Sequence, residues 1–196
     1  MGPRSSLSLH AVMLAAGGSS RFGSPKQLTR YDGQPLLNRA LSGAAEVASA
    51  VTVVLGAHAA EIAAILPPGR ASVLVNREWQ EGIASSLRTA VRALPGSCDG
   101  VLVLLADQPL VAATSLSRLT SAWRRRPRQI IASRYSGVTG VPAIFPRWCF
   151  SELCALRGDQ GARALIARHL DHVLAVEHPE AAIDIDHPED LLNLSS

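Results

Sequence analysis

Aromatic residues are scarce in this 196-residue chain, at 4% of the sequence, although hydrophobic residues reach 47%. A core with so few rings must be built from Ala, Val, Leu and Ile, as in the sheets and helices of a layered α/β protein. The densest basic run, residues 124–128, has no aromatic residues interleaved with it that would stack on nucleic-acid bases. We therefore interpret this run as a solvated helix end and expect no nucleic-acid partner.

Cysteine and long apolar runs are also scarce. The three cysteines, Cys98, Cys149 and Cys154, are an odd number and lack the paired spacing of a metal site, so we expect reduced thiols. No apolar run approaches the length of a membrane-spanning helix, and residues 1–8 lack the apolar core of a signal peptide. These absences predict a cytoplasmic protein with no membrane partner. The sequence also shows no obvious Ser/His/Asp or Cys/His arrangement, which agrees with chemistry that needs no protein nucleophile.

The strongest functional signal is the segment of residues 14–26, LAAGGSSRFGSPK. An apolar run typical of a buried strand leads into it, and the six residues after Leu14 are all small. A loop of small residues leaves its backbone N–H groups accessible to an anion, and glycine permits the dihedral angles that such a concave loop requires. Arg21 and Lys26 bring two cations to the same loop, and both side chains suit phosphate oxygens. The segment therefore predicts a polyphosphate site.

The same segment does not match the two best-known glycine loops. Gly18 and Gly23 have the separation of a P-loop, but Ser24 and Pro25 follow where a Lys and a Ser or Thr are required. A dinucleotide-binding loop leads straight into a helix, whereas the next helix here is expected only from about residue 36. An ordinary turn at the end of a strand is the alternative interpretation, and the two cations favour the phosphate site.

The order of the expected elements indicates an α/β fold in a single domain over residues 1–196. Strands are expected at residues 10–14, 50–55 and 72–75, with helices at residues 36–47 and 57–66 between them. This alternation predicts parallel strands joined by right-handed crossovers, and the most apolar strand, residues 100–105, should lie centrally. The second half adds expected strands at residues 130–135, 141–145 and 173–176, and expected helices from about residue 113 and at 147–156 and 162–169.

Ligands of parallel sheets bind beyond the carboxyl ends of the strands, so the residues that follow each strand are the candidates for binding. Asn76 follows the third strand and would read the edge of a base, because its amide carries both donors and an acceptor. Ser85 and Ser86 precede a helix expected from about residue 87; they would offer N–H groups to a ligand or act as caps alone. Asp107 follows the central strand and is the best candidate for a Mg²⁺ ligand, with a helix cap as the alternative.

The second half of the chain supplies further candidates. Gly140, Val141 and Pro142 predict a tight apolar turn near the same edge of the sheet, or a role in shape alone. The loop of residues 158–161 leads into an expected helix whose first turn carries Arg163. Such a helix start would hold an anion through the helix dipole and free N–H groups, and a solvent-facing helix start is the alternative.

Two carboxylates stand close to the end of the chain. Asp184 and Asp186 are separated by a single residue, and an extended segment would place both on the same face. Pro188 then begins an expected helical turn, so Asp186 is also a candidate helix cap. On spacing alone the cap is the favoured interpretation.

Four segments together carry a resemblance to a known family: LAAGGSSRFGSPKQL, NREWQEGIASSLR, ADQPLV and DIDHPEDL. In this order they resemble the MobA-like NTP transferases over about residues 10–192. The greatest likeness is to the molybdenum cofactor cytidylyltransferases of the MocA type, which GIASSLR and the later RGDQGAR segment favour. The resemblance implies a Rossmann-like three-layer nucleotidyltransferase fold, with a mostly parallel central sheet and helices on both faces. It also implies a nucleotide-binding half of about residues 8–110 and an acceptor-binding half of about residues 111–196.

The positions of the candidate residues, together with the resemblance, assign roles to individual residues. Nucleotide binding is assigned to Leu14, Ala15, Ala16, Gly17, Gly18, Ser20, Arg21, Lys26, Asn76, Ser85, Ser86 and Asp107. Acceptor binding is assigned to Gly140, Pro142, Asp159, Gly161, Arg163 and Asp184. Arg21, Lys26 and Asp107 would be catalytic, and Asp107 with Asp186 would hold Mg²⁺, the expected cofactor; whether Asp184 takes the place of Asp186 stays open. His187 stands where family members often have Thr, a departure within the loop that carries Asp186.

The activity that the resemblance implies is transfer of CMP from CTP to the phosphate of the molybdenum cofactor (molybdopterin), with release of pyrophosphate. An acceptor phosphate is already ionised near pH 7, since its second pKa is about 6, so no general base is required. One alternative is a MobA-like transferase that uses GTP, or a sugar or alcohol phosphate acceptor. Another is a non-catalytic carrier or insertion factor for the molybdenum cofactor. A molybdenum hydroxylase or its maturation factor is the expected transient partner.

Overall fold

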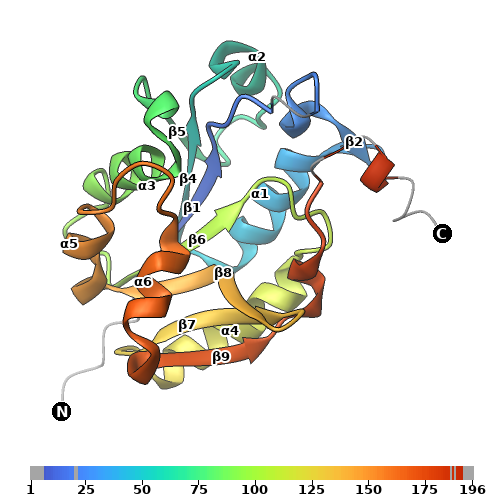
Figure 1. The fold of residues 1–196 in the computed structure, drawn as a ribbon. Helices are drawn as coiled ribbons and strands as arrows, with labels where there is room; N and C mark the ends of the chain where they lie inside the picture. The colour runs from blue at the N-terminus through green and yellow to red at the C-terminus, as the bar shows by residue number, and fades with distance from the viewer. Residues whose placement is uncertain (1–6, 20–21, 186, 188, 192–196) are drawn as a thin grey trace.

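The computed structural model describes residues 7–19, 22–185, 187 and 189–191. Within these residues, seven strands form one sheet in the order β5-β4-β1-β6-β8-β7-β9 (Figure 1). The strands are β1 (Leu9–Ala15), β4 (Ala50–Leu55), β5 (Ser72–Val75), β6 (Gly100–Leu105), β7 (Ile130–Tyr135), β8 (Val138–Pro146) and β9 (Val173–Glu177), and a separate hairpin is formed by β2 (Arg30–Tyr31) and β3 (Gln34–Pro35). Only β8 runs antiparallel to its neighbours in the large sheet, so the expected mostly parallel sheet is confirmed.

Helices cover both faces of this sheet (Figure 1). One face carries α1 (Leu36–Val47), α2 (Ala59–Ala64) and α4 (Ala113–Arg125), and the other carries α3 (Ile83–Arg92), α5 (Phe150–Leu153) and α6 (Ala162–Arg168). Short 3₁₀ helices are η1 (Lys26–Leu28), η2 (Trp79–Glu81), η3 (Arg147–Cys149), η4 (Leu170–His172) and η5 (Pro179–Ala182). These three layers confirm the expected Rossmann-like fold. In the described part of the chain, no helix combines the length and apolarity needed to cross a membrane.

Strand β1 lies at the centre of the core because both of its faces are buried. Ala11, Val12 and Met13 are completely buried, as expected for a continuous apolar run in a parallel sheet. The few aromatic rings need dedicated space in such an aliphatic core. Gly100, at the start of β6, provides it for Trp123, because a Cβ at Gly100 would lie 2.5 Å from Cζ2 of the indole.

The hairpin between β7 and β8 differs from the expected turn over residues 136–140. Its turn consists of Ser136 and Gly137 alone, and both have positive φ, at 45° and 75°. This geometry suits a two-residue type I′ turn, which matches the twist of the paired strands. Gly140 and Pro142 therefore lie inside β8, and the prediction that they form a tight turn was wrong.

Other boundaries also differ from the expectations. Helix α2 begins only at Ala59, because His58 has a left-handed conformation with φ of 55°. The segment 147–156 divides into η3 and the one-turn helix α5. Residues 182–185 do not join a sheet: η5 ends at Ala182, and the N–H of Ile185 donates to the carbonyl of Asp107 at 2.9 Å. Ile183 itself has an extended conformation, with φ of −111° and ψ of 111°, and the chain returns to the carboxyl edge of the sheet.

A buried histidine fixes the chain after β9. The hydroxyl of Ser133 donates to the carbonyl of Pro142 at 2.6 Å. The same hydroxyl oxygen lies 2.7 Å from Nδ1 of His178. Burial lowers the pKa of His178 to about 4; the charge of Glu180 opposes this effect and that of Arg118 adds to it. The ring is therefore neutral at pH 7, and it joins β7, β8 and the end of β9.

Neutral His178 predicts a pH-dependent stability. The unfolded ring binds a proton near pH 6.5 and the folded ring only near pH 4, so the free energy of unfolding should fall as the pH drops between these values. The loss in the free energy of unfolding that is attributable to this group should be on the order of 3 kcal/mol. His178→Asn keeps a polar atom near the Nδ1 position and should show a shallower decline in denaturant titrations from pH 7 to pH 4, whereas exposed His172→Asn should not. Parallel curves for wild type and His178→Asn would contradict the prediction.

Candidate functional site

A cavity of about 390 Å³ opens at the carboxyl edge of the sheet, beyond the ends of β1 and β6. Its lining includes eight residues that the sequence predicted for the site: Leu14, Ala15, Ala16, Gly17, Lys26, Ser86, Asp107 and Asp159. It also includes residues that the sequence analysis missed: Gln27, Trp79, Gln80, Gly82, Ile83, Leu105 and Ala106. The rule that ligands bind beyond the strand ends therefore selected the edge where this cavity opens, but only part of its lining.

The loop of small residues after β1 is held by one buried side chain. Gln27 is 4% exposed, and its amide donates to the carbonyls of Ala15 at 3.1 Å and Gly17 at 3.3 Å. Ser19 has a positive φ of 51°, and its hydroxyl accepts a hydrogen bond from the N–H of Lys26 at 3.2 Å. These contacts fix the loop while leaving it free of side-chain bulk. The available signal for Gln27 was its position directly after Lys26 in the same motif.

Lys26 and Asp107 meet at the edge of this cavity although 81 residues separate them in the sequence. Nζ of Lys26 donates to Oδ2 of Asp107 at 2.6 Å, and the two side chains are 19% and 17% exposed. Helix α4 has Ala112 at its N-cap and Asp107 lies well before it, so the helix cap considered for Asp107 is not formed. The structure therefore brings together two of the three residues predicted to be catalytic.

The second carboxylate oxygen of Asp107 is suited to a divalent cation. Oδ1 is buried and has no hydrogen-bond partner among the described residues. A buried carboxylate oxygen is costly without a partner, and a hard cation held by one or two carboxylates plus phosphate oxygens would supply one. In the ranges that the structure describes, no group of three or more His, Cys, Asp and Glu side chains is arranged to hold a metal ion. The donor set thus fits a cation that is shared with a phosphate ligand.

Three predicted residues, Ser20, Arg21 and Asp186, lie outside the described residues. Their roles as nucleotide-binding residues and as second metal ligand stay predictions from the sequence. The backbone bond between Ile185 and Asp107 brings the segment that precedes Asp186 to the site.

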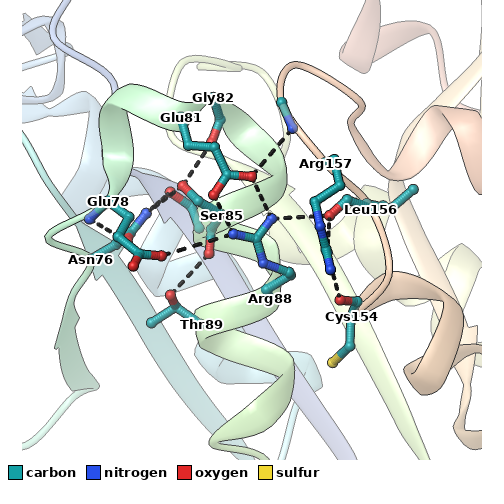
Figure 2. Close-up of polar contacts among 12 residues, drawn as sticks. Asn76, Glu78, Glu81, Gly82, Ser85, Arg88, Thr89, Cys154, Leu156 and Arg157 are labelled. Atoms are coloured by element: carbon teal, nitrogen blue, oxygen red, sulfur yellow. Dashed lines mark hydrogen bonds and ion pairs between the residues drawn. The ribbon is translucent and has the colours of Figure 1, made fainter.

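Asn76, Ser85 and Ser86 form an internal brace. Helix α3 begins at Ile83, so both serines lie in its first turn and the prediction that they cap a helix starting near residue 87 was wrong. Nδ2 of Asn76 donates to the hydroxyls of Ser85 at 2.8 Å and Ser86 at 3.0 Å, and its Oδ1 accepts the N–H of Glu78 at 3.0 Å. The side chain of Asn76, 3% exposed, is thus already engaged within the protein (Figure 2), so the geometry favours a bracing role over the expected reading of a base edge.

Trp79 forms one wall of the cavity, a role that the sequence analysis did not predict. Its ring lies 3.5 Å from the Cβ position of Gly18, and the Cβ position of Gly56 would be only 2.6 Å from Cβ of Trp79. Gly56 therefore leaves the room that the indole needs, and the ring lies in ordinary van der Waals range of Gly18 in the small-residue loop. An aromatic face beside an anion-binding loop offers a stacking surface for a base.

Two of the residues predicted for the acceptor, Asp159 and Gly161, lie at or next to the cavity lining. Asp159 lines the cavity, and the Cβ position of Gly161 would lie 3.6 Å from Ile83 at the start of α3. Burial raises the pKa of Tyr135, with the charges of Asp184 and Asp107 adding to the rise and that of Arg163 opposing it. The sequence analysis did not select Tyr135, although the charges of Asp184, Arg163 and Asp107 all influence its pKa.

Comparison with known proteins decides the family. The sequence profile of the MobA-like NTP transferase domain matches residues 11–173. The chain belongs to this family. It is 32% identical over 171 residues to nicotine blue oxidoreductase of Paenarthrobacter nicotinovorans, covering 79% of each chain. It is 28% identical over 193 residues to molybdenum cofactor guanylyltransferase of Sinorhizobium fredii (strain NBRC 101917 / NGR234), covering 95% of this chain and 86% of that protein.

Solved structures include a similar protein of about the same length. The crystal structure of Rv0371c from Mycobacterium tuberculosis H37Rv superposes with a TM-score of 0.84 at 31% identity, covering 97% of this chain and 98% of that one. A structure of Rv0371c in complex with manganese gives a TM-score of 0.78 at 30% identity, covering 95% and 97%. The resemblance drawn from the sequence motifs is therefore confirmed at the level of the family and the fold. The two curated relatives carry names of different activities, so family membership alone selects neither the base nor the acceptor.

Proposed function

We propose that this MobA-like protein is a divalent-metal-dependent nucleotidyltransferase that transfers CMP from CTP to the phosphate of molybdopterin and releases pyrophosphate. The observation that carries this proposal is the contact of Lys26 with Asp107 at a cavity floored by the small-residue loop. A phosphate-binding cation and a carboxylate suited to a divalent cation lie 2.6 Å apart there. This pairing suits a metal-bound triphosphate better than an uncharged ligand.

In this proposal the nucleotide lies across the cavity. The base packs beside Trp79, and the triphosphate lies over residues 15–19, whose small side chains leave the backbone accessible. Lys26 donates to the phosphate oxygens, and Arg21 supplies a second cation from the same motif. The choice of CTP rests on the likeness of GIASSLR and RGDQGAR to the cytidylyltransferase sequences.

The reaction requires alignment and charge neutralisation. An oxygen of the acceptor phosphate attacks the α-phosphorus of CTP and forms a new P–O bond, while the bond to the bridging oxygen of the β-phosphate breaks and pyrophosphate leaves with its electron pair. The acceptor phosphate is already ionised near pH 7, so no side chain must remove a proton. A divalent cation, when bound at Asp107, would neutralise charge on the leaving pyrophosphate. Lys26 and the small-residue loop hold the triphosphate in line with the acceptor.

The acceptor occupies the opposite side of the site in this proposal. Asp159 and Gly161 border it, Arg163 meets its phosphate or pterin, and Asp184 contacts it from the returning chain; Gly140 and Pro142 shape the nearby strand. The similarity to a protein named molybdenum cofactor guanylyltransferase supports a pterin acceptor. The charge pair at Lys26 also argues against the alternative of a non-catalytic carrier, because a carrier of finished cofactor needs no metal-triphosphate site.

The proposal is tested by incubating purified protein with Mg²⁺, molybdenum cofactor and each of the four ribonucleoside triphosphates in turn, with released pyrophosphate as the readout. We expect turnover with CTP that requires the cofactor and is at least tenfold faster than with GTP. Omission of the molybdenum cofactor and its replacement by a sugar phosphate are the matched controls. Preferred turnover of GTP, or of a sugar phosphate acceptor, would establish the corresponding alternative. Cofactor binding without turnover of any triphosphate would establish a carrier.

A further inference from the structure

Arg88 is a buried arginine whose contacts lie outside the cavity. It is 7% exposed on α3, and arginine is rarely so buried unless it is paired. Its guanidinium donates to both carboxylate oxygens of Glu81, at 2.8 and 2.5 Å, and to the carbonyl of Leu156 at 3.0 Å. Figure 2 shows the guanidinium between these two partners, which belong to different parts of the chain. We call residues 78–82 the nucleotide loop and residues 156–161 the acceptor loop.

Two further hydrogen bonds hold Gly158 of the acceptor loop, one to the nucleotide loop and one to the first turn of α3. Oε1 of Glu81 accepts the N–H of Gly158 at 3.4 Å, and the carbonyl of Gly158 accepts the N–H of Ala84 at 3.1 Å. Glu81 thus contacts both the arginine and the acceptor loop. Arg88 reaches the acceptor loop directly through Leu156, so the guanidinium and the carboxylate together form a clamp between the loops.

The clamp sits directly behind two residues of the cavity wall. Gly82 and Asp159 both line the cavity, and they approach so closely that a Cβ at Gly82 would lie 2.5 Å from Oδ1 of Asp159. The same Cβ would lie 2.5 Å from the carbonyl oxygen of Gly158, and Gly82 has a φ of 116° that favours glycine. A small separation of the loops would therefore change the shape of the cavity at this wall.

We propose that Arg88 and Glu81 are positioning residues, which hold the acceptor loop against the nucleotide loop and so set the wall of the nucleotide site at Gly82 and Asp159. This inference rests on the proposed function, because it assigns the cavity to the nucleotide. The clamp couples the two halves of the site. The nucleotide loop cannot adopt its binding shape unless the acceptor loop is docked on it.

The charge state of the clamp is constant under assay conditions. The hydrogen bond from Arg88 lowers the pKa of Glu81 to about 2, against the smaller opposing effect of burial. The same hydrogen bond raises the pKa of Arg88. Both groups are therefore ionised throughout the neutral range. The effect of a substitution on binding then reflects the lost contacts and charge, and does not depend on the pH of the assay.

Arg88→Lys is the most informative substitution. Lysine keeps the positive charge but lacks the planar fork, so it cannot bond both oxygens of Glu81 and the Leu156 carbonyl at once. Glu81→Gln provides a second variant of nearly equal shape, in case Arg88→Lys fails to fold. Arg92→Lys, at an exposed position in the last turn of the same helix, is the matched control.

Two measurements on the full-length protein test the clamp. Hydrogen exchange followed by mass spectrometry should show faster exchange in residues 156–161 of both clamp variants, and no change in Arg92→Lys. Steady-state kinetics should show a KM for CTP raised by about tenfold, with kcat changed by less than about threefold. The cavity wall lies away from the reacting phosphorus, so it should bind the ground state and the transition state of CTP equally. A purely structural role would instead lower the active fraction, which reduces kcat and leaves KM unchanged.

The outcomes separate this inference from the proposed function. Unchanged exchange in the acceptor loop, or faster exchange with an unchanged KM, would overturn the clamp while turnover itself upheld the proposed function. If the wild type turns over no triphosphate, the proposed function fails, and calorimetric titration with a non-hydrolysable CTP analogue and Mn²⁺ replaces the kinetics. Weaker analogue binding by both clamp variants would then support the positioning role, and equal or absent binding in all four proteins would overturn it.

Discussion

Asp107→Asn is expected to lower kcat by on the order of 10²–10³-fold while the protein stays folded. Asparagine has the same shape, but it lacks the negative charge that pairs with Lys26 at 2.6 Å and that would hold a divalent cation through the buried Oδ1. The loss should fall on kcat more than on the KM for CTP, because charge on the leaving pyrophosphate develops only in the transition state. Pyrophosphate release measured across a Mg²⁺ titration checks this, with denaturant unfolding as the test of folding.

The exposed residue Asp171 offers a matched control, since Asp171→Asn removes an equal charge from η4. This variant should retain wild-type turnover and metal dependence. Removal of the metal by a chelator should abolish turnover in the wild type, and Mn²⁺ should restore it, as the manganese complex of the relative Rv0371c suggests. Unchanged Mg²⁺-dependent pyrophosphate release by Asp107→Asn would show that the metal assignment is wrong.

Lys26→Met should lower kcat/KM by about 10²-fold or more, the second large effect that we expect. Methionine keeps an unbranched apolar stem and loses the ammonium that donates to Asp107 and, in the proposed complex, to the triphosphate. Lys26→Arg should recover only part of the activity, because a planar fork does not replace a point charge at this distance. Arg92→Met is the control for loss of an exposed cation. Near-normal kcat/KM in Lys26→Met would exclude a role in phosphate binding.

Lys26 is the only lysine in the sequence, and the other 18 basic residues are arginines. An amine-specific reagent therefore reports on this one side chain, once peptide mapping separates it from the N-terminal amine. Labelling at Lys26 should slow in the presence of CTP and Mg²⁺, because the bound triphosphate would cover Nζ. This provides a readout of nucleotide binding at the site that does not depend on turnover.

The fold was largely predictable because its signals are local. The continuous apolar runs of β1, β4 and β6 and the helical segments between them determine a parallel sheet, and the carboxyl-edge rule then places Lys26 and Asp107 in one region. The β7–β8 turn was misplaced because Ser136 and Gly137 suffice to close it. A run of Gly, Val and Pro soon afterwards looks like part of a turn. In the structure it marks an irregularity inside β8, because the register against β7 shifts between Gly140 and Ala143.

The candidate site was less predictable, because its side chains choose partners that are distant in sequence. From the sequence alone, the amide of Asn76 could bind the edge of a base as well as a partner within the protein. Only the position of α3 shows that it donates to two serine hydroxyls. The start of α3 itself depends on the φ of 116° at Gly82, which no residue pattern displays. Trp79 was missed because its position depends on the space left by Gly56, a glycine in another loop.

The measurement that tests the central claim most directly is the fate of the α-phosphate. Purified protein is incubated with Mg²⁺, molybdenum cofactor and CTP labelled with ³²P at the α-phosphorus, and the products are separated by chromatography. Nucleotidyl transfer predicts label in a pterin dinucleotide, with an equimolar amount of unlabelled pyrophosphate. Label recovered only in CTP, or only in free CMP, would contradict the account.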